Sequence, residues 1–147
     1  MLYQQPDMKN VTLALLFLFF AFSIGAQAPV ALRVALNWEA LPSAVTVEGT
    51  SYERWRFADA VLSDEMPTLP WVIRQFPVNT AGTLSVEIIN ARFEPFERQA
   101  TLDDDFLEEN IRFVTQVARD RQGYSAQVSF VPIVKNGSRY ERLVEAE

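Results

Sequence analysis

Residues 125–144 read SAQVSFVPIVKNGSRYERLV, and this stretch decides the fold class. Two runs of alternating apolar and polar residues, 125–134 and 140–144, lie on either side of Asn136-Gly137. Asn-Gly between such runs is the strongest short-range hairpin signal, because both residues tolerate the positive φ of a type I′ turn. We therefore expect a strand through Phe130, a tight turn at Asn136-Gly137 and a return strand through Leu143.

The same alternation recurs upstream of this hairpin, with period two over segments of five to eleven residues. Between the segments lie Gly, Pro, Asn and Asp, which favour turns. The expected strands cover residues 30–37, 44–48, 51–57, 71–78, 83–93 and 111–118. Pro95 then favours a sheet edge or a strand end, because it lacks an N–H. Many short strands at this spacing predict an all-β fold, an antiparallel β-sandwich-like domain over residues 29–147.

One short helix is expected, over residues 101–110. Thr101 would cap it, and Asp103-Asp104-Asp105 suits the positive end of a helix dipole. With Glu108 and Glu109, this run could also offer the oxygen ligands that Ca²⁺ prefers. It lacks the alternating spacing and the Gly of an EF-hand loop, so a solvated helix start is the favoured interpretation. Asp64-Glu65 is a weaker example of the same pattern.

Two aromatic positions have the look of binding residues, and packing in the core is the alternative for each. Trp55 stands between Arg54 and Arg56, and a strand would turn its ring inward while both arginines face water. Trp71 follows Pro70, an arrangement that suits a peptide-binding aromatic and a core residue equally. The sequence thus predicts no catalytic, cofactor-binding or metal-binding residue.

The 147 residues contain no cysteine and no histidine. This excludes disulfides, thiol nucleophiles and thiolate zinc sites, and it removes the usual general base of serine and cysteine hydrolases. A net charge of −6 argues against a nucleic-acid-binding surface, which needs clustered Lys and Arg. A hydrolase that uses only carboxylates is the enzymatic alternative, but no Asp/Glu pairing gives a catalytic signature. No cofactor is expected.

Residues 1–28 have the pattern of a secretory signal peptide. Lys9 precedes the apolar run 11–25, and Ala26-Gln27-Ala28 offers a small-x-small cleavage site. The run is about 15 residues long, whereas a bilayer-crossing helix needs roughly 20. We expect cleavage after Ala28, export to the periplasm or outer-membrane surface, and no membrane span after signal removal. Met1 and Met8 are both candidate start residues.

Two further stretches resemble a known family. Residues 66–78, which read MPTLPWVIRQFPV, resemble the G-x-P-x-L-P stretch and following strand near the start of gingipain-like cysteine peptidases, with the Gly absent here. Residues 128–144 look like the v-x-f-x-P-i-x-x-x-x-G-x-x-x-x-L strand pair of the type IX secretion system sortase. The resemblance spans most of residues 29–144.

In that family this region is a β-rich N-terminal domain, and the catalytic Cys and His lie further downstream. The resemblance therefore implies a non-catalytic domain that supports a catalytic peptidase domain or other secretion-system components. Full-length relatives cleave a sorting signal from exported proteins and attach the remainder to a surface lipopolysaccharide. The alternative is a free-standing exported β-sandwich that binds a protein or glycan partner at the cell surface.

An accessory domain of this kind is expected to present an apolar face to its neighbour. Trp38, Trp55, Trp71 and Phe76 are the candidate residues for that face, although some of them must form the domain's own core. The chain ends at Glu147, directly after an expected strand. Because a sandwich usually closes with another strand, the sequence leaves open whether residues 29–147 are a complete domain or a truncated one.

Overall fold

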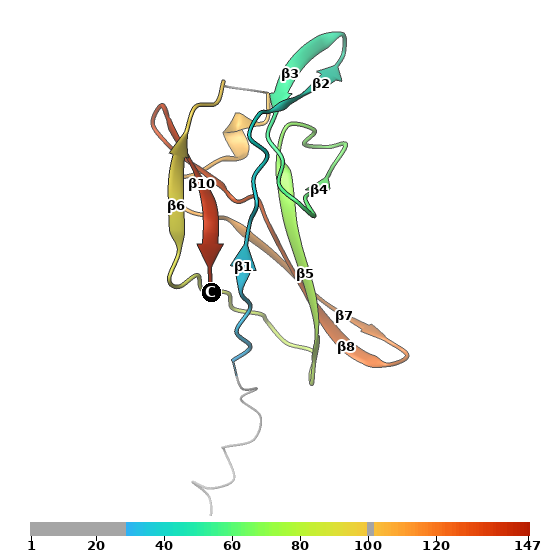
Figure 1. Cartoon of the computed structure of the whole chain (residues 1–147). Helices are drawn as coiled ribbons and strands as arrows, with labels where there is room; N and C mark the ends of the chain where they lie inside the picture. The colour runs from blue at the N-terminus through green and yellow to red at the C-terminus, as the bar shows by residue number, and fades with distance from the viewer. Residues whose placement is uncertain (1–28, 100–101) are drawn as a thin grey trace, which may run out of the picture. The chain divides into compact units, whose positions relative to one another are not determined.

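The computed structural model describes residues 29–99 and 102–147 (Figure 1). The expected signal peptide, residues 1–28, and the expected cap, Thr101, lie outside the described residues. Residues 31–147 form one compact unit. Its strands are β1 (Val34–Ala35), β2 (Ser43–Val47), β3 (Thr50–Arg54), β4 (Val61–Leu62), β5 (Pro70–Val78), β6 (Arg92–Phe96), β7 (Phe113–Asp120), β8 (Gly123–Phe130), β9 (Ile133–Asn136) and β10 (Arg139–Ala146), with one 3₁₀ turn, η1 (Asp104–Phe106).

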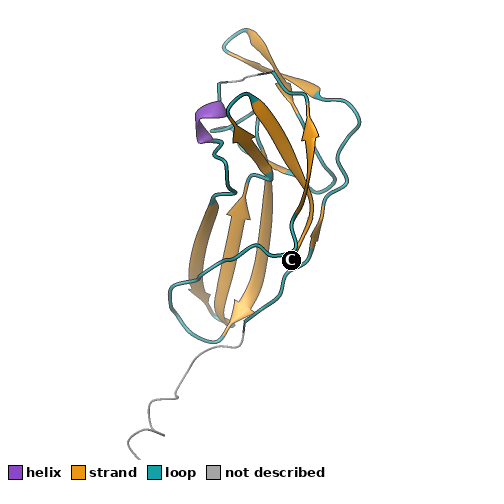
Figure 2. Ribbon diagram, turned by 90° about the vertical axis from the view of Figure 1, so that its left-hand side faces the viewer, coloured by secondary structure: helices purple, strands orange, loops and turns teal. Residues whose placement is uncertain are grey.

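The strands form antiparallel sheets, which confirms the predicted all-β, sandwich-like fold (Figure 2). One sheet has the order β4-β5-β8-β7. In the other, β10 pairs with β6 along one side and with β9 and then β1 along the other. β2 and β3 form a separate two-stranded hairpin. The segment Val131-Pro132 takes the chain from β8 in one sheet to β9 in the other.

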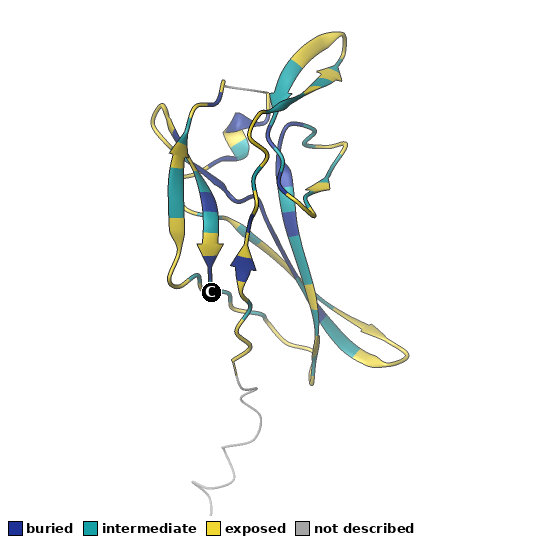
Figure 3. Cartoon of the chain, in the orientation of Figure 1, coloured by how far each residue is buried: buried dark blue, intermediate teal, exposed yellow. Residues whose placement is uncertain are grey.

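The core lies where side chains of the two larger sheets meet. Val72 of β5 and Phe130 of β8 are buried in one cluster with Val34 of β1 and Leu143 of β10. Buried segments of β1, β5 and β10 are dark blue in Figure 3. A second buried cluster comprises Leu69, Leu107, Val131, Ile133 and Tyr140. The apolar positions of the alternating segments are therefore the ones whose side chains fill the core.

Three expected strands are shorter or more broken than predicted. The run 125–134 is two strands, because Pro132 has no N–H to continue a ladder. Residues 30–37 contribute only the two residues of β1, although Val34 and Leu36 are buried on one face as expected.

Residues 83–93 also differ from the prediction. Their alternating apolar side chains pack half-buried against the core, but residues 83–90 form no strand. Ile89 alone exchanges two backbone hydrogen bonds, of 2.6 and 2.9 Å, with Glu147. Asn90 has φ of 50°, which bends the chain before β6 begins at Arg92. Pro95 lies in β6, whose position at the edge of its sheet agrees with the prediction.

The predicted hairpin is present, but its two loop residues are Gly137 and Ser138 and not Asn136 and Gly137. Asn136 is the last residue of β9 and pairs with Arg139, so Gly137 and Ser138 form the two-residue loop. Gly137 has φ of 61°, whereas neither Asn136 nor Ser138 has positive φ. Positive φ at only the first loop residue is the pattern of a type II′ turn, which uses Gly there. The type I′ expectation is therefore wrong, while the hairpin is confirmed.

Candidate functional site

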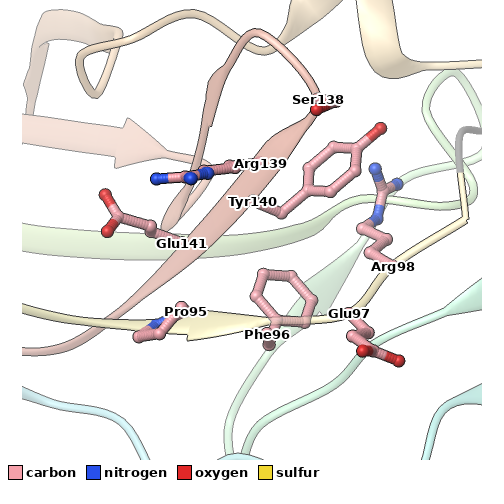
Figure 4. A pocket seen from close by; sticks show the side chains of 8 residues that line it. All are labelled: Pro95, Phe96, Glu97, Arg98, Ser138, Arg139, Tyr140 and Glu141. Atoms are coloured by element: carbon pink, nitrogen blue, oxygen red, sulfur yellow. The ribbon is translucent and has the colours of Figure 1, made fainter.

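Asp104 on η1 is the centre of a buried polar cluster. Its carboxylate accepts a hydrogen bond from the Tyr140 hydroxyl and forms an ion pair with Arg98, whose side chain is fully buried. The ammonium of Lys135 lies 3.3 Å from the same carboxylate. Figure 4 shows the ends of the Arg98 and Tyr140 side chains turned toward the same region. The cluster therefore joins residues from η1, β9, β10 and the segment after β6.

Asp103 extends the cluster toward the turn before β5. Its carboxylate accepts hydrogen bonds from the backbone N–H of Thr68, at 2.9 Å, and from the Thr68 hydroxyl. Both Asp103 and Asp104 are buried, and among the described residues 102–110 only the three residues of η1 are helical. The expected helix over 101–110 and its solvated start are thus wrong. The aspartates are held by partners distant in sequence, and Asp103 makes no capping hydrogen bond to η1.

Tyr140 is kept protonated by its surroundings. Burial raises the pKa of its phenol to about 12, and the hydrogen bond to Asp104 and that carboxylate's charge act in the same direction. The positive charge of Arg98 opposes them. Arg98 and Lys135 also lie 5.5 and 5.8 Å from the centre of the tyrosine ring. At neutral pH Tyr140 is therefore a hydrogen-bond donor and not a base.

The cluster lies beside a surface depression between β6 and the start of β10. Its lining residues are Pro95, Phe96, Glu97, Arg98, Ser138, Arg139, Tyr140 and Glu141 (Figure 4). Glu97, Arg139 and Glu141 are exposed, so its accessible charges are of both signs. Among the residues that the structure describes, no group of three or more acidic side chains is placed to hold a metal ion.

The aromatic residues form part of the core. The guanidinium of Arg142 lies 5.5 to 5.6 Å from the ring centres of Trp38, Trp55 and Phe96, and the Trp38 indole N–H donates to the Leu143 carbonyl at 2.8 Å. Trp55 is buried, as predicted. Its neighbours Arg54 and Arg56 are half-buried instead of fully solvated.

The proposed uncovered aromatic face is therefore not present. Trp71 is half-buried with its ring 5.4 Å from that of Phe106, and Phe76 packs half-buried against the first core cluster. With Trp38 half-buried and Trp55 buried, none of the four expected residues is exposed. The core interpretation of Trp55 is confirmed, and Trp71 packs half-buried against the second core cluster. The expectation of an exposed aromatic surface is wrong.

Sequence reasoning did not find Arg98, Tyr140 or Arg142. Tyr140 lies 36 residues from Asp104, so no local spacing connects them. The Asp run was recognised, but its partners could not be identified. In the part of the chain that the structure describes, no helix is long and apolar enough to cross a membrane.

Comparison with known proteins gives a match at the level of fold. No family model and no curated protein matches the chain. A chain from the complex of Porphyromonas gingivalis RgpB pro- and mature domains is similar, with a TM-score of 0.56 and 12% sequence identity, over 78% of this chain and 73% of that chain. The chain therefore shares a fold with part of the RgpB complex, in keeping with the gingipain-like resemblance in its sequence.

Proposed function

We propose that this chain is a non-catalytic β-domain that binds a gingipain-like cysteine peptidase domain and supports it. The observation that carries the proposal is the fold shared with part of a pro-domain and mature-domain complex. A chain without cysteine cannot itself supply the nucleophile of a cysteine peptidase. In such an assembly, this chain would be the domain that binds the peptidase.

The positions of the two family-like stretches support the same proposal. Residues 66–78 form the turn held by Asp103 and the whole of β5. Residues 128–144 include the end of β8, all of β9 and most of β10. The resemblance thus lies on strands of both larger sheets, including the central strands β5 and β10. We place the domain N-terminal to the peptidase, as in type IX secretion sortase-like proteins.

Export is part of the proposal. A chain that carries residues 1–28 as a signal peptide would reach the periplasm or outer-membrane surface, where such peptidases act. N-terminal sequencing of protein from a periplasmic fraction should begin at Pro29. An intact Met1 or Met8 terminus in that fraction would contradict export by cleavage.

The partner is tested through the gene and the protein together. The DNA that follows the codon for Glu147 should encode a domain with the Cys and His of a peptidase. The full chain, purified after export, should then co-elute with that domain in size-exclusion chromatography. Heat-unfolded chain is the control and should not co-elute. A stop codon directly after the codon for Glu147, followed by an unrelated gene, would favour the free-standing cell-surface module.

Activity gives a second, independent test. The chain alone should not cleave Arg- or Lys-containing peptides. Cleavage that persists at constant specific activity through repeated purification would refute the non-catalytic assignment.

A further inference from the structure

The outer edge of β7 is the longest unpaired strand edge in the described part of the molecule. β7 has eight residues, and each pairs with β8 in one unbroken register. The sheet order ends at β7, and none of its residues has a further backbone partner among the residues that the structure describes (Figure 1). A row of main-chain donors and acceptors is therefore available to another extended strand.

Other edges of the larger sheets are protected in ways that β7 is not. β4 has only two residues. β6 contains Pro95 between the charged residues Arg92, Glu94 and Glu97. Beyond its short contact with β4, β5 carries Arg74 and Pro77. Short length, proline and charge are the usual devices that prevent edge-to-edge pairing.

Most of the β7 edge lacks these devices, since its charged residues, Arg119 and Asp120, are confined to the end of the strand. Its first six residues, 113–118, contain no charge and no proline. Val114 is 49% exposed, and residues 115 and 116, which point to opposite faces, are both exposed. β2 is also uncharged, but it is a five-residue strand in a two-stranded ribbon. The features of β7 are those of a strand that pairs with another chain.

We propose that β7 pairs antiparallel with β7 of a second copy of this chain. The argument for a second copy is charge complementarity in one register. With Gln116 opposite Gln116 of the second copy, Arg112 stands opposite Asp120 at both ends of the strand pair. Val114 then faces Ala118, so each remaining pair on this face is uncharged. All of these positions are even-numbered and share one face of the strand.

The end charges lie at the surface, although the Arg112 guanidinium also lies 5.5 Å from the centre of the Phe106 ring. The Arg112 side chain is 56% exposed and lies 3.6 Å from Glu108, also exposed. Asp120 accepts backbone hydrogen bonds from Gln122 and Gly123, which use one of its oxygens. A single strand pair buries less than the roughly 1,200–2,000 Å² of a stable interface. The dimer is therefore a concentration-dependent one, in exchange with the monomer.

The register predicts a reciprocal test at Gln116. Lysine at this position would stand opposite lysine, and glutamate opposite glutamate, at the closest cross-strand approach. Gln116→Lys and Gln116→Glu should each dimerise roughly two- to fivefold more weakly than the original chain. An equimolar mixture of the two variants should recover dimers, because lysine then faces glutamate. Recovery also shows that both variants fold.

Gln75→Lys is the matched control. Gln75 is exposed and lies in the same cross-strand row of the sheet, opposite Gln127 on the other side of β8. Its substitution should leave the dimer unchanged. The full chain, purified after export, is examined by sedimentation velocity over a wide range of concentration. A weight-average mass that stays monomeric overturns the proposal, as does equal weakening by Gln75→Lys or failure of the mixture to recover dimers.

Discussion

Asp104 and Asp105 are neighbours on η1 whose carboxylates lie in opposite environments. Asp104 is buried among Arg98, Lys135 and Tyr140, whereas Asp105 is exposed. A charge brought out of water is tolerated only where paired charges and hydrogen bonds replace its hydration. The same residue type therefore has a structural role at one position and a solvent-facing role at the next.

Asp104→Ala should lower the free energy of unfolding by about 3–5 kcal/mol, because Arg98 and Tyr140 would lose a buried partner. Asp105→Ala is the control and should change it by less than about 0.5 kcal/mol. Urea unfolding followed by far-UV circular dichroism measures both. Similar values for the two variants would show that the cluster contributes little to stability.

Tyr140 gives the cluster a dependence on alkaline pH. The pKa of its phenol is about 12 in the folded chain, against about 10 for an unperturbed tyrosine. The folded state therefore favours the protonated phenol. The stability from this difference, about 3 kcal/mol, is fully present below pH 10 and is lost as the pH rises from about 10 through 12.

Tyr140→Phe should remove this component. Its unfolding midpoint should fall less between about pH 9 and about pH 12 than that of the original chain. Tyr52→Phe, at a half-buried position on β3, is the control and should keep the full decline. The same alkaline decline in all three proteins would contradict the role of Tyr140.

At the scale of elements, the β9–β10 hairpin depends on one backbone conformation. Gly137 has φ of 61°, and an added Cβ there would have no atom within 4 Å. The cost of Gly137→Val is therefore backbone strain without a collision, about 1–3 kcal/mol. Ser138→Val changes the other loop residue, which does not have positive φ. It should lower the free energy of unfolding by less than Gly137→Val. Equal unfolding midpoints for the two variants would contradict the assigned turn.

Local pattern predicted most elements, because alternation and turn residues act over a few neighbouring residues. The β2–β3, β7–β8 and β9–β10 hairpins all lie where expected. The pattern could not show that residues 83–90 lack a strand partner, since strand pairing depends on segments that are far apart in the sequence. For the same reason it could not bring Asp103 to Thr68, 35 residues away. Local pattern therefore could not predict the polar cluster around Asp104. It identified the acidic run but not the residues that pair with it.

At the scale of the whole compact unit, the two larger sheets share one core. Leu143 of β10 is fully buried in the cluster that also holds Val72 and Phe130. Its N–H donates to the Pro132 carbonyl at 2.9 Å, and its carbonyl accepts from Trp38. One residue therefore contacts the core, the crossing between the sheets and the aromatic cluster around Arg142. The first core cluster therefore depends on both sheets.

Leu143→Ala should lower the free energy of unfolding by about 2–5 kcal/mol, through lost apolar burial and the cavity left behind. Because the sheets share this core, tryptophan fluorescence and far-UV circular dichroism should report one coincident transition in both the original chain and the variant. Leu41→Ala is the control, since Leu41 is 77% exposed, and it should shift the transition little. Fluorescence and circular dichroism curves that separate would mean that the sheets unfold independently. The chain would then act as two loosely joined layers, which would count against the proposed role as one domain that supports a peptidase.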